Sequence, residues 1–293
     1  MTRPIAVRRL TSPDEFKAVQ HLERTVWGMD PIPIHQTLTA VKNGGILIGS
    51  FDGDRLVGFC YAFPGFDGKR TYLCSHMMGV APSYRGMGLG KRMKWAQREW
   101  ALSRGYSLIT WTYDPLESVN ASLNLNALRA ICSTYVENCY GEMDDVLNRG
   151  LPTDRFQVEW WLDSPHVTNP APPPTTMGLH RRVCDWSVNS DGMPQLPENV
   201  EQTLAGAEHF PDATDSLLVP IPVRFQHIKS RDPVLARDWR MKTRTIFQAL
   251  FSKGYAATGT LRQSGEPVHY YVLQQRERLR IDASAETEKG DKS

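Results

Sequence analysis

A glycine-rich segment at positions 85–90, RGMGLG, constrains the fold of this chain more than any other feature. It follows an apolar stretch at 71–80 that predicts a strand, and it precedes a run with helical spacing. The first N–H groups of a helix have no backbone partner, and the helix dipole favours negative charge there. Glycine lets a phosphate approach the main chain closely because it has no Cβ. The segment therefore predicts an anion site where a strand leads into a helix.

Two well-known phosphate-binding motifs do not fit this segment. A Walker A loop needs a glycine five positions before Gly90 and a serine or threonine after Lys91, where the chain has Arg85 and Arg92. A dinucleotide fingerprint that begins at Gly86 needs a glycine at position 91, which is lysine. The pattern that fits is R-x-x-G-x-G. A plain tight turn would need neither three glycines nor an arginine in this order.

The first half of the chain alternates between expected strands and expected helices. Strands are expected at 5–10, 45–51, 56–63, 71–80, 107–113 and 156–162. One helix should begin at the Ser12-Pro13 cap and end near Gly28, and a second should run from Leu89 to a stop at Gly105. A third, long helix is expected to reach about Asn138. This order predicts a mixed α/β domain.

The composition changes at Asp163, and the second half of the chain is expected to form a separate unit. Prolines dominate residues 164–176, which predicts a semi-rigid linker between a first domain at 1–163 and a smaller α/β domain at 177–282. In that domain a helix should begin at Asp232-Pro233 and end at Gly254, followed by two strands. Residues 283–293 are polar and are expected to be disordered.

Charge and cysteine content argue against several classes of function. The 293 residues carry a formal net charge of +2, without the clustered basic excess of proteins that coat nucleic acids. The five cysteines are scattered and form no C-x-x-C pair, so they predict neither a zinc site nor a dithiol couple. Neither a signal peptide nor an apolar run long enough to span a bilayer is present. We therefore expect a cytoplasmic protein without a metal, a nucleic-acid partner or a membrane partner.

The pattern R-x-x-G-x-G, preceded by VAPSY at 80–84, resembles the acyl-CoA loop of the GCN5-related N-acetyltransferase (GNAT) superfamily. The resemblance covers roughly residues 1–163 and includes the order of strands and helices. It implies a mixed, strongly bent sheet with helices on both faces, and acyl-CoA as the co-substrate. The segments WTYDP at 111–115 and LPTDRF at 151–156 are similar to a large bacterial branch of two-domain members. Some members of that branch are associated with the N-acylation of amino acids, including succinylation.

The resemblance assigns the cofactor mainly to main-chain groups. The pantetheine arm would pair with Met78 and Val80 like an added strand. Family members tend to place an asparagine seven residues before the catalytic tyrosine, where this chain has Leu128, and Asn120 and Asn126 are the nearest substitutes. The CoA pyrophosphate would be held by the backbone N–H groups of Arg85, Gly86, Met87, Gly88, Leu89 and Gly90.

The resemblance also points to a tyrosine as the acid that protonates the departing thiolate. The stretch YVENCYG at 135–141 is similar to the family's usual ending of the helix after the fifth strand, so Tyr135 is the predicted acid and Tyr140 its rival. A phenol with a pKa of about 10 suits a thiolate whose pKa is about 8.5. The alternative interpretation of Tyr135 is an aromatic residue packed in the core.

His76 is the predicted base that takes the proton of the attacking amine. It lies on the strand that would line the acyl site, where some members of the superfamily carry a histidine. An imidazole with a pKa of about 6.5 could accept this proton directly or through a water. A structural histidine is the alternative. Asp114 and Glu117 are the carboxylate candidates, although Asp114-Pro115 is also a turn signal.

Two expected helices carry basic residues that could bind ligands or serve only solubility. On the helix after the glycine segment, Lys91, Arg92 and Lys94 could reach the 3′-phosphate of CoA. On the C-terminal helix, one of four side chains could bind a substrate carboxylate. These four are Arg237, Arg240, Lys242 and Arg244.

The sequence therefore predicts an acyl-CoA-dependent N-acyltransferase. The acceptor would be the primary amine of a small molecule, with an amino acid as one candidate, and the acyl group would be acetyl or a relative such as succinyl. Attack would be direct, without a cysteine or serine nucleophile. Two other classes stay open: a non-catalytic acyl-CoA sensor, because the asparagine before Tyr135 is missing, and a protein-interaction module. A homodimer is compatible with each of them.

Overall fold

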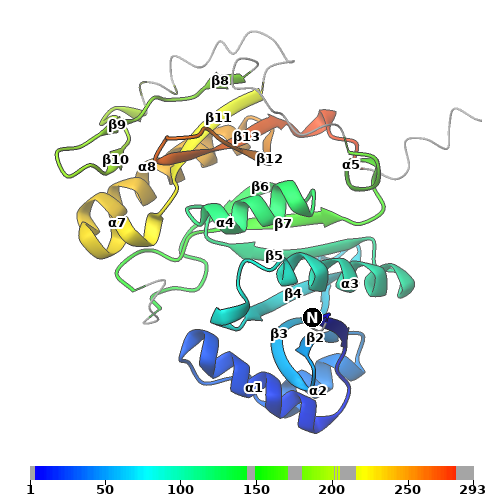
Figure 1. Ribbon diagram of the computed structural model, residues 1–293. Coiled ribbons are helices and arrows are strands. Elements are labelled where there is room, and N and C mark those ends of the chain that lie inside the picture. The colour runs from blue at the N-terminus through cyan, green and yellow to red at the C-terminus, as the bar shows by residue number, and fades with distance from the viewer. Residues whose placement is uncertain are drawn as a thin grey trace, which may run out of the picture. The chain divides into compact units, whose positions relative to one another are not determined.

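The computed structural model describes residues 4–143, 149–170, 180–200, 202, 204 and 216–281. Contacts divide the chain into unit 1, residues 1–111 and 160–163, and unit 2, residues 112–159 and 164–293 (Figure 1). This division differs from the boundary at 163 expected from the sequence, because β6 (Ile131–Val136) pairs with β12 (Tyr255–Arg262) and groups with the C-terminal strands. The predicted tail at 283–293 and residues 171–176 of the predicted linker lie outside the described residues.

The sheet of unit 1 is mainly antiparallel. Its strands are β1 (Ala6–Arg9), β2 (Ile46–Asp52), β3 (Arg55–Phe66), β4 (Thr71–Val80) and β5 (Leu108–Tyr113). The first four pair antiparallel in chain order, and β5 pairs parallel with β4. The β4–β5 ladder joins only Leu73 with Ile109 and Cys74 with Thr110. The later part of β4 therefore leaves one edge of its main chain outside the ladder.

The first helix of unit 1 forms as its sequence signals predict. α1 (Pro13–Trp27) begins at a capping box in which the side chains of Ser12 and Glu15 each bond the other's backbone N–H. It ends at Gly28, whose φ of 68° is a left-handed conformation that glycine adopts without a steric penalty. A second helix, α2 (Ile34–Lys42), was not predicted from the sequence.

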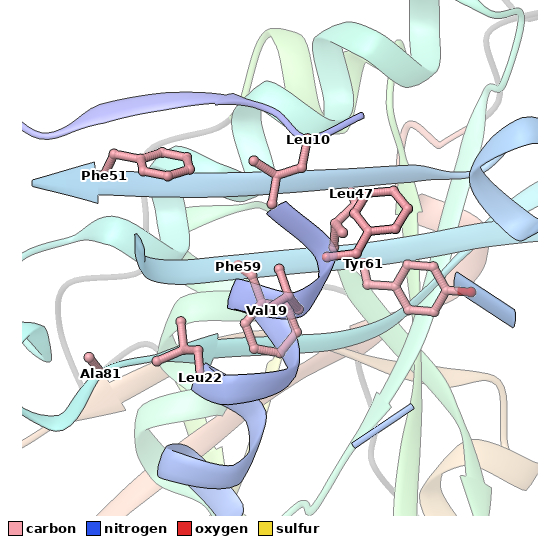
Figure 2. Close-up of a cluster of buried hydrophobic side chains, with 9 residues drawn as sticks. Leu10, Val19, Leu22, Leu47, Phe51, Phe59, Tyr61 and Ala81 are labelled. Carbon is pink, nitrogen blue, oxygen red and sulfur yellow. The ribbon is translucent and has the colours of Figure 1, made fainter. Parts of the chain in front are cut away.

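Helices cover both faces of this sheet, as the resemblance implied. α1 packs on the side of β3 that carries Phe59, in the core cluster shown in Figure 2. α3 (Leu89–Ser103) packs on the side that carries Cys60, because Gln97 on α3 donates to the Cys60 thiol. Neighbouring residues of a strand point to opposite faces, so α1 and α3 lie on opposite sides. The start of α3, with the glycine segment before it, is thereby held at the end of β4.

Unit 2 is built on a second group of strands and one long helix. The hydrogen-bonded order of its strands is β7 (Arg155–Trp161), β6, β12, β13 (Val268–Gln275), β11 (Ser216–Pro222) and β8 (His180–Arg182), and a separate ribbon joins β9 (Ser187–Val188) with β10 (Pro194–Gln195). Its helical elements are α4 (Ser118–Ala121), the π-helical η2 (Ser122–Ala127), α5 (Pro165–Thr168), α7 (Phe225–Arg231), α8 (Pro233–Ser252) and η5 (Arg276–Arg278).

The structure confirms the helix that was predicted to begin at Asp232-Pro233 and to end at Gly254. Asp232 caps α8 by accepting a hydrogen bond from the Leu235 N–H at 2.9 Å, and Gly254 follows its end with a φ of 82°. The predicted apolar face is buried, including Trp239 and Ile246. The strands expected after this helix are β12 and β13, which pair antiparallel.

The prediction of a long helix that reaches Asn138 is wrong. Helical structure ends at Ala127, and Arg129 then takes a left-handed φ of 60° that no continuing α-helix permits. The next residues, Ile131–Val136, form β6 because this run is rich in β-branched and aromatic side chains. Tyr135 therefore lies on a strand rather than late in a helix.

Candidate functional site

The glycine segment places free N–H groups at the start of α3. Gly86 and Gly88 have φ values of 80° and 73°, and a Cβ at either position would meet no atom within 4 Å. Gly88 is the N-cap of α3, and no side chain caps it. In the described part of the chain, the backbone N–H groups from Gly86 to Lys91 have no hydrogen-bond acceptor. Unpaired amides at a helix start fit a diphosphate.

Arg85 differs from this pattern. Its backbone N–H donates to the Pro82 carbonyl at 3.3 Å, in the short 3-10 turn Pro82–Tyr84. The Arg85 amide therefore does not fit the role in the cradle that the sequence predicted, and its exposed side chain is what it can offer a phosphate. Tyr84 fixes this turn, because its hydroxyl donates to the Asp52 carboxylate at 2.7 Å.

Met78 and Val80 lie on β4 beyond its short ladder with β5. The Ala81 N–H points toward β3, since it donates to the Val57 carbonyl at 2.8 Å. Main-chain groups of neighbouring residues in a strand point to opposite edges, so the polar groups of Val80 and Met78 should point away from β3. This edge could accept an extended pantetheine arm as an added strand.

His76 lies at a bulge in β4. Tyr61 pairs with Met77 but Phe63 pairs with Cys74, so β4 carries an extra residue there. The imidazole lies 5.7 Å from the Phe63 ring and 6.3 Å from the Tyr61 ring, measured between centroids. Partial burial among these aromatic groups lowers the pKa of His76. The imidazole is therefore neutral at pH 7 and able to accept a proton.

Lys94 is buried, which contradicts the prediction that it reaches a phosphate or solvent. The residue is 2% exposed, and its Nζ donates to the Ser75 hydroxyl at 2.7 Å, beside the bulge. The ammonium also lies 3.6 Å from the centre of the Trp111 ring. Burial lowers the pKa of Lys94 to about 8. Lys91 stays exposed, whereas Arg92 donates to the Ile5 carbonyl at 2.6 Å.

Lys94→Met is expected to make the protein more stable at neutral pH, by about 1 to 3 kcal/mol, because it removes a buried charge without a carboxylate partner. In the unfolded chain lysine binds its proton up to a pH of about 10.4. Between pH 8 and pH 10 Lys94 thus holds its proton more often in the unfolded chain than in the folded one, so its destabilising contribution should shrink as the pH rises. Urea unfolding of both proteins across this range should show the stability gain of Lys94→Met over the wild type becoming smaller as the pH rises.

The control for this variant is Lys91→Met, on the exposed side of the same helix. It should change the free energy of unfolding by less than about 0.5 kcal/mol. An unchanged pH dependence in Lys94→Met would mean that Lys94 does not titrate in this window.

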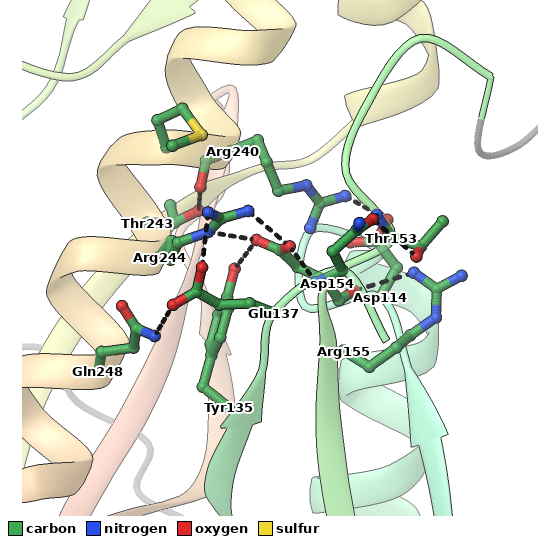
Figure 3. Close-up of polar contacts among 12 residues, drawn as sticks. Asp114, Tyr135, Glu137, Thr153, Asp154, Arg155, Arg240, Thr243, Arg244 and Gln248 are labelled. Atoms are coloured by element: carbon green, nitrogen blue, oxygen red, sulfur yellow. Dashed lines mark hydrogen bonds and ion pairs between the residues drawn. The ribbon is translucent and has the colours of Figure 1, made fainter. Parts of the chain in front are cut away.

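Tyr135 belongs to a polar network in unit 2, shown in Figure 3. Its hydroxyl donates to Asp154 at 2.6 Å, and Asp154 also accepts two hydrogen bonds from Arg244, at 2.9 and 2.8 Å. Arg244 and Gln248 in turn both bond Glu137, at 2.8 and 2.7 Å. Burial, followed by the charge of Asp154, raises the pKa of Tyr135. The phenol therefore holds its proton tightly.

A second buried pair lies in the same network. Arg240 is 1% exposed and bonds Asp114. Burial acts to lower the pKa of Arg240, but the neighbouring Asp114 outweighs it and raises that pKa. Asp114 also accepts from the Leu116 N–H at 2.8 Å, which makes it a turn residue with a buried partner. Glu117 accepts from Gln226 at 2.6 Å, and burial raises its pKa.

The remaining candidate site residues from the sequence are Tyr140, Asn120 and Asn126. Tyr140 is 50% exposed, and its hydroxyl lies 2.7 Å from the Thr112 hydroxyl. Asn126 is used structurally, because its side chain bonds the backbone N–H and carbonyl of Thr260 at 2.8 and 2.9 Å. Asn120 is exposed on α4 and is the asparagine that stays available for a ligand.

A cavity of about 730 Å³ lies in unit 2. Its lining comprises Asn138, Glu142, Met143, Arg149, Gly150, Leu151, Pro152, Arg237 and Arg244. Of the four basic side chains on the C-terminal helix, Arg240, Arg244 and Lys242 have carboxylate partners. Arg237 is exposed and has no hydrogen bond or ion pair with the residues that the structure describes. It is thus the guanidinium that can take a new anion.

Sequence reasoning missed Asp154 and gave Lys94 and Arg240 other roles, although all three residues organise these sites. Lys94 follows Met93, and no local signal distinguished it from its exposed neighbour Lys91. Asp154 and Arg240 lie 86 positions apart in the sequence and meet the same network only in the folded chain. Within the described ranges, no group of three or more His, Cys, Asp or Glu side chains is arranged to hold a metal. Nor does any helix there have the length and apolarity needed to cross a bilayer.

The profile of the acetyltransferase (GNAT) family matches residues 6–128. A similar solved structure is the ribosomal-protein-S18-alanine N-acetyltransferase from Escherichia coli, at 14% identity and a TM-score of 0.45, covering 54% of this chain and 94% of that one. A putative GNAT acetyltransferase from Desulfovibrio desulfuricans is also similar, at 14% identity and a TM-score of 0.44, covering 54% and 99%.

A third similar structure is yncA, a putative acetyltransferase from Salmonella typhimurium with its cofactor acetyl-CoA. It shares 14% identity at a TM-score of 0.44, covering 55% of this chain and 95% of that one. No curated protein matches the sequence.

Proposed function

Because residues 6–128 belong to the acetyltransferase (GNAT) family, we propose that this protein transfers an acyl group from acyl-CoA to the primary amine of a small molecule by direct attack. The observation that carries the proposal is the row of unpaired N–H groups from Gly86 to Lys91. Open space at Gly86 and Gly88 lets a pyrophosphate reach these groups. The segment therefore serves as the cofactor cradle.

The reaction forms a bond between the amine nitrogen and the thioester carbonyl carbon while the carbon–sulfur bond breaks. His76 takes the proton that the amine loses, directly or through a water. The main-chain edge at Met78 and Val80 aligns the pantetheine arm, and a tyrosine returns a proton to the thiolate. A cysteine or serine nucleophile is not required.

His76 sets the acid limb of the pH profile in this proposal. Its lowered pKa keeps the imidazole neutral down to a pH below its ordinary value of about 6.5. We expect kcat/KM for acyl transfer to fall only below that pH, as His76 becomes protonated. The pH profile of His76→Ala should lack this acid limb, and its kcat should be about 100-fold lower than that of the wild type. The exposed His35→Ala is the matched control, and an unchanged acid limb in His76→Ala would exclude His76 as the base.

Two tyrosines compete for the role of acid. The Tyr135 hydroxyl donates a hydrogen bond to Asp154, and the raised pKa of Tyr135 makes it a poor proton donor to a thiolate. The Tyr140 hydroxyl bonds only the Thr112 hydroxyl among the described residues, and Tyr140 is half exposed. These contacts favour Tyr140 over Tyr135 as the acid. Comparing Tyr140→Phe with Tyr135→Phe for thiolate release tests the assignment.

The acceptor is a small molecule that carries both an amine and a carboxylate, and it binds in the cavity of about 730 Å³ in unit 2. Arg237 supplies a guanidinium that is free to pair with the carboxylate. Glu142 in the same lining can hold the ammonium form of the amine before it loses its proton. An amino acid has this combination of groups.

Arg237→Gln is expected to raise KM for the acceptor about 10- to 100-fold, because a charge-assisted hydrogen bond contributes about 1.5–3 kcal/mol. The kcat should change little, since Arg237 holds the substrate and not the reacting atoms. Steady-state kinetics with the wild type and with Arg231→Gln, an exposed arginine outside the cavity, give the comparison. Equal KM values for the acceptor in the wild type, Arg237→Gln and Arg231→Gln would show that Arg237 does not bind the acceptor.

The activity itself is tested with the full chain, acetyl-CoA or succinyl-CoA and a pooled set of amines. Thiol release that depends on the amine supports the transferase. One observation favours a second candidate, a non-catalytic acyl-CoA sensor: the hydroxyl of Tyr135 is bound to a carboxylate. CoA binding without turnover would support the sensor. Absence of CoA binding would leave an interaction module.

A further inference from the structure

A second cavity in unit 2, about 290 Å³ in volume, lies where several neighbouring strands begin or end. β8 pairs parallel with β11, so His180 lies opposite Ser216. β11 pairs antiparallel with β13, and the pairing of Leu217 with Leu273 leaves Ser216 beside Gln274. The sheet thus places His180, Ser216 and Gln274, from three neighbouring strands, side by side in the lining of the cavity.

Two further segments close this cavity. The backbone N–H of His166, on the short element α5 (Pro165–Thr168), donates to the Arg280 carbonyl at 2.9 Å. This bond joins α5 to the chain that follows β13 and η5. Arg129 enters from the segment before β6, with a φ of 60° that a non-glycine residue seldom adopts. Residues far apart in the sequence are therefore gathered around one small space.

The lining of this second cavity is basic. It comprises Arg129, Pro165, His166, Asn169, Pro170, His180, Ser216, Thr258, Gln274, Arg278, Leu279 and Arg280, with three arginines, two histidines and no aspartate or glutamate. No hydrogen bond or ion pair with a described residue occupies the side chains of Arg129 and Arg278. Like charges gathered in this way repel one another, and a bound anion would relieve the repulsion.

The two histidines also point to a ligand. The Nε2 atoms of His166 and His180 are buried and have no hydrogen-bond partner among the described residues. Buried polar atoms in folded proteins are seldom left without a partner. The other ring nitrogen of His180, Nδ1, bonds the Ser216 hydroxyl, which fixes the ring. Burial, followed for His166 by the charge of Arg129, lowers the pKa of both imidazoles.

We propose that this cavity binds a phosphate group, with Arg129 and Arg278 as the charged partners and the Nε2 atoms of His166 and His180 as further hydrogen-bonding groups. Guanidinium groups match the oxygens of a phosphate in geometry and charge. The site uses none of the residues of the glycine segment, so it goes beyond the proposed acyl transfer. Its volume exceeds that of a bare phosphate ion, which leaves room for the organic part of a phosphate monoester.

The test is calorimetric titration of the full chain, without CoA, with inorganic phosphate and with glycerol 3-phosphate at constant ionic strength. We expect saturable binding that Arg278→Gln weakens at least 10-fold. Arg129→Asn should weaken it similarly, and asparagine tolerates the left-handed backbone at this position. Tighter binding of glycerol 3-phosphate would assign the site to a phosphate monoester, and tighter binding of inorganic phosphate would assign it to the free ion.

The start of α3 could also attract phosphate, so Gly88→Ala, which places a Cβ in that site, is the matched control and should leave this binding unchanged. Proton NMR of the imidazole rings gives a second readout, because a bound phosphate should raise the pKa of both His166 and His180. The proposal is overturned if Arg278→Gln and Arg129→Asn bind phosphate like the wild type. It is overturned as well if sodium chloride at the same ionic strength produces the same heat and the same shifts.

Discussion

Gly88→Ala is expected to weaken acyl-CoA binding about 100-fold. Gly88 is the N-cap of α3, and its amide is one of those that would face the pyrophosphate. A Cβ at this position projects into the open space that a phosphate would occupy, and hydrogen bonds to a charged group contribute about 1.5–3 kcal/mol. Equilibrium titration with CoA, and KM for acyl-CoA where turnover is observed, measure the loss.

The control for Gly88→Ala is Gly105→Ala, at the other end of the same helix. Gly105 has a φ of 81°, and a Cβ there, like one at Gly88, would meet no atom within 4 Å. Both substitutions therefore strain the backbone by about 1 kcal/mol, but only the first touches the proposed cradle. Equal CoA affinities in the two variants would contradict the assignment of the glycine segment to the cofactor.

Asp154→Ala is expected to destabilise unit 2 by about 3–5 kcal/mol. The Asp154 side chain is 0% exposed and bonds Tyr135, Arg244 and the backbone N–H of Asn138 (Figure 3). Removing the carboxylate leaves the Arg244 guanidinium and the Tyr135 hydroxyl without this partner, and breaking a buried pair in this way is strongly destabilising. Denaturant unfolding followed by tryptophan fluorescence measures the change.

An exposed ion pair of the same unit serves as the comparison for Asp154. Asp185 has a side chain that is 87% exposed and lies 3.7 Å from Arg182. Asp185→Ala should cost less than about 1 kcal/mol, because water already solvates both partners. A loss at Asp154 no larger than the loss at Asp185 would show that the network is not a structural element of unit 2.

The unpaired amides of the glycine segment could be predicted from the sequence because they depend on local structure. The six positions 85–90 determine where backbone amides are left unpaired, and the neighbouring strand and helix follow from short-range patterns. The capping signals of α1 and α8 are equally local, and the structure confirms both helices. Only the Arg85 amide departs from the expectation, because the turn before it supplies an acceptor.

The position of Tyr135 could not be predicted in the same way. The run from Ser118 to Val136 holds helix-compatible residues and β-branched residues together, and either structure can form locally. Pairing of β6 with β7 and contact with β12 stabilise the strand, and these partners lie far along the chain. Tertiary pairing thus overrode the local signal.

The sequence by itself determined a local arrangement: a strand, a glycine segment and a helix whose first amides have no acceptor among the described residues. Only the tertiary structure decided which charged side chains are available. It buried Lys94 beside a bulge, paired Arg240 and Arg244 with carboxylates, and left Arg237 without a hydrogen bond or ion pair among the described residues. The physical reason is that unpaired amides follow from the local course of the backbone, whereas the partner of a side-chain charge is set by which distant segments pack against it.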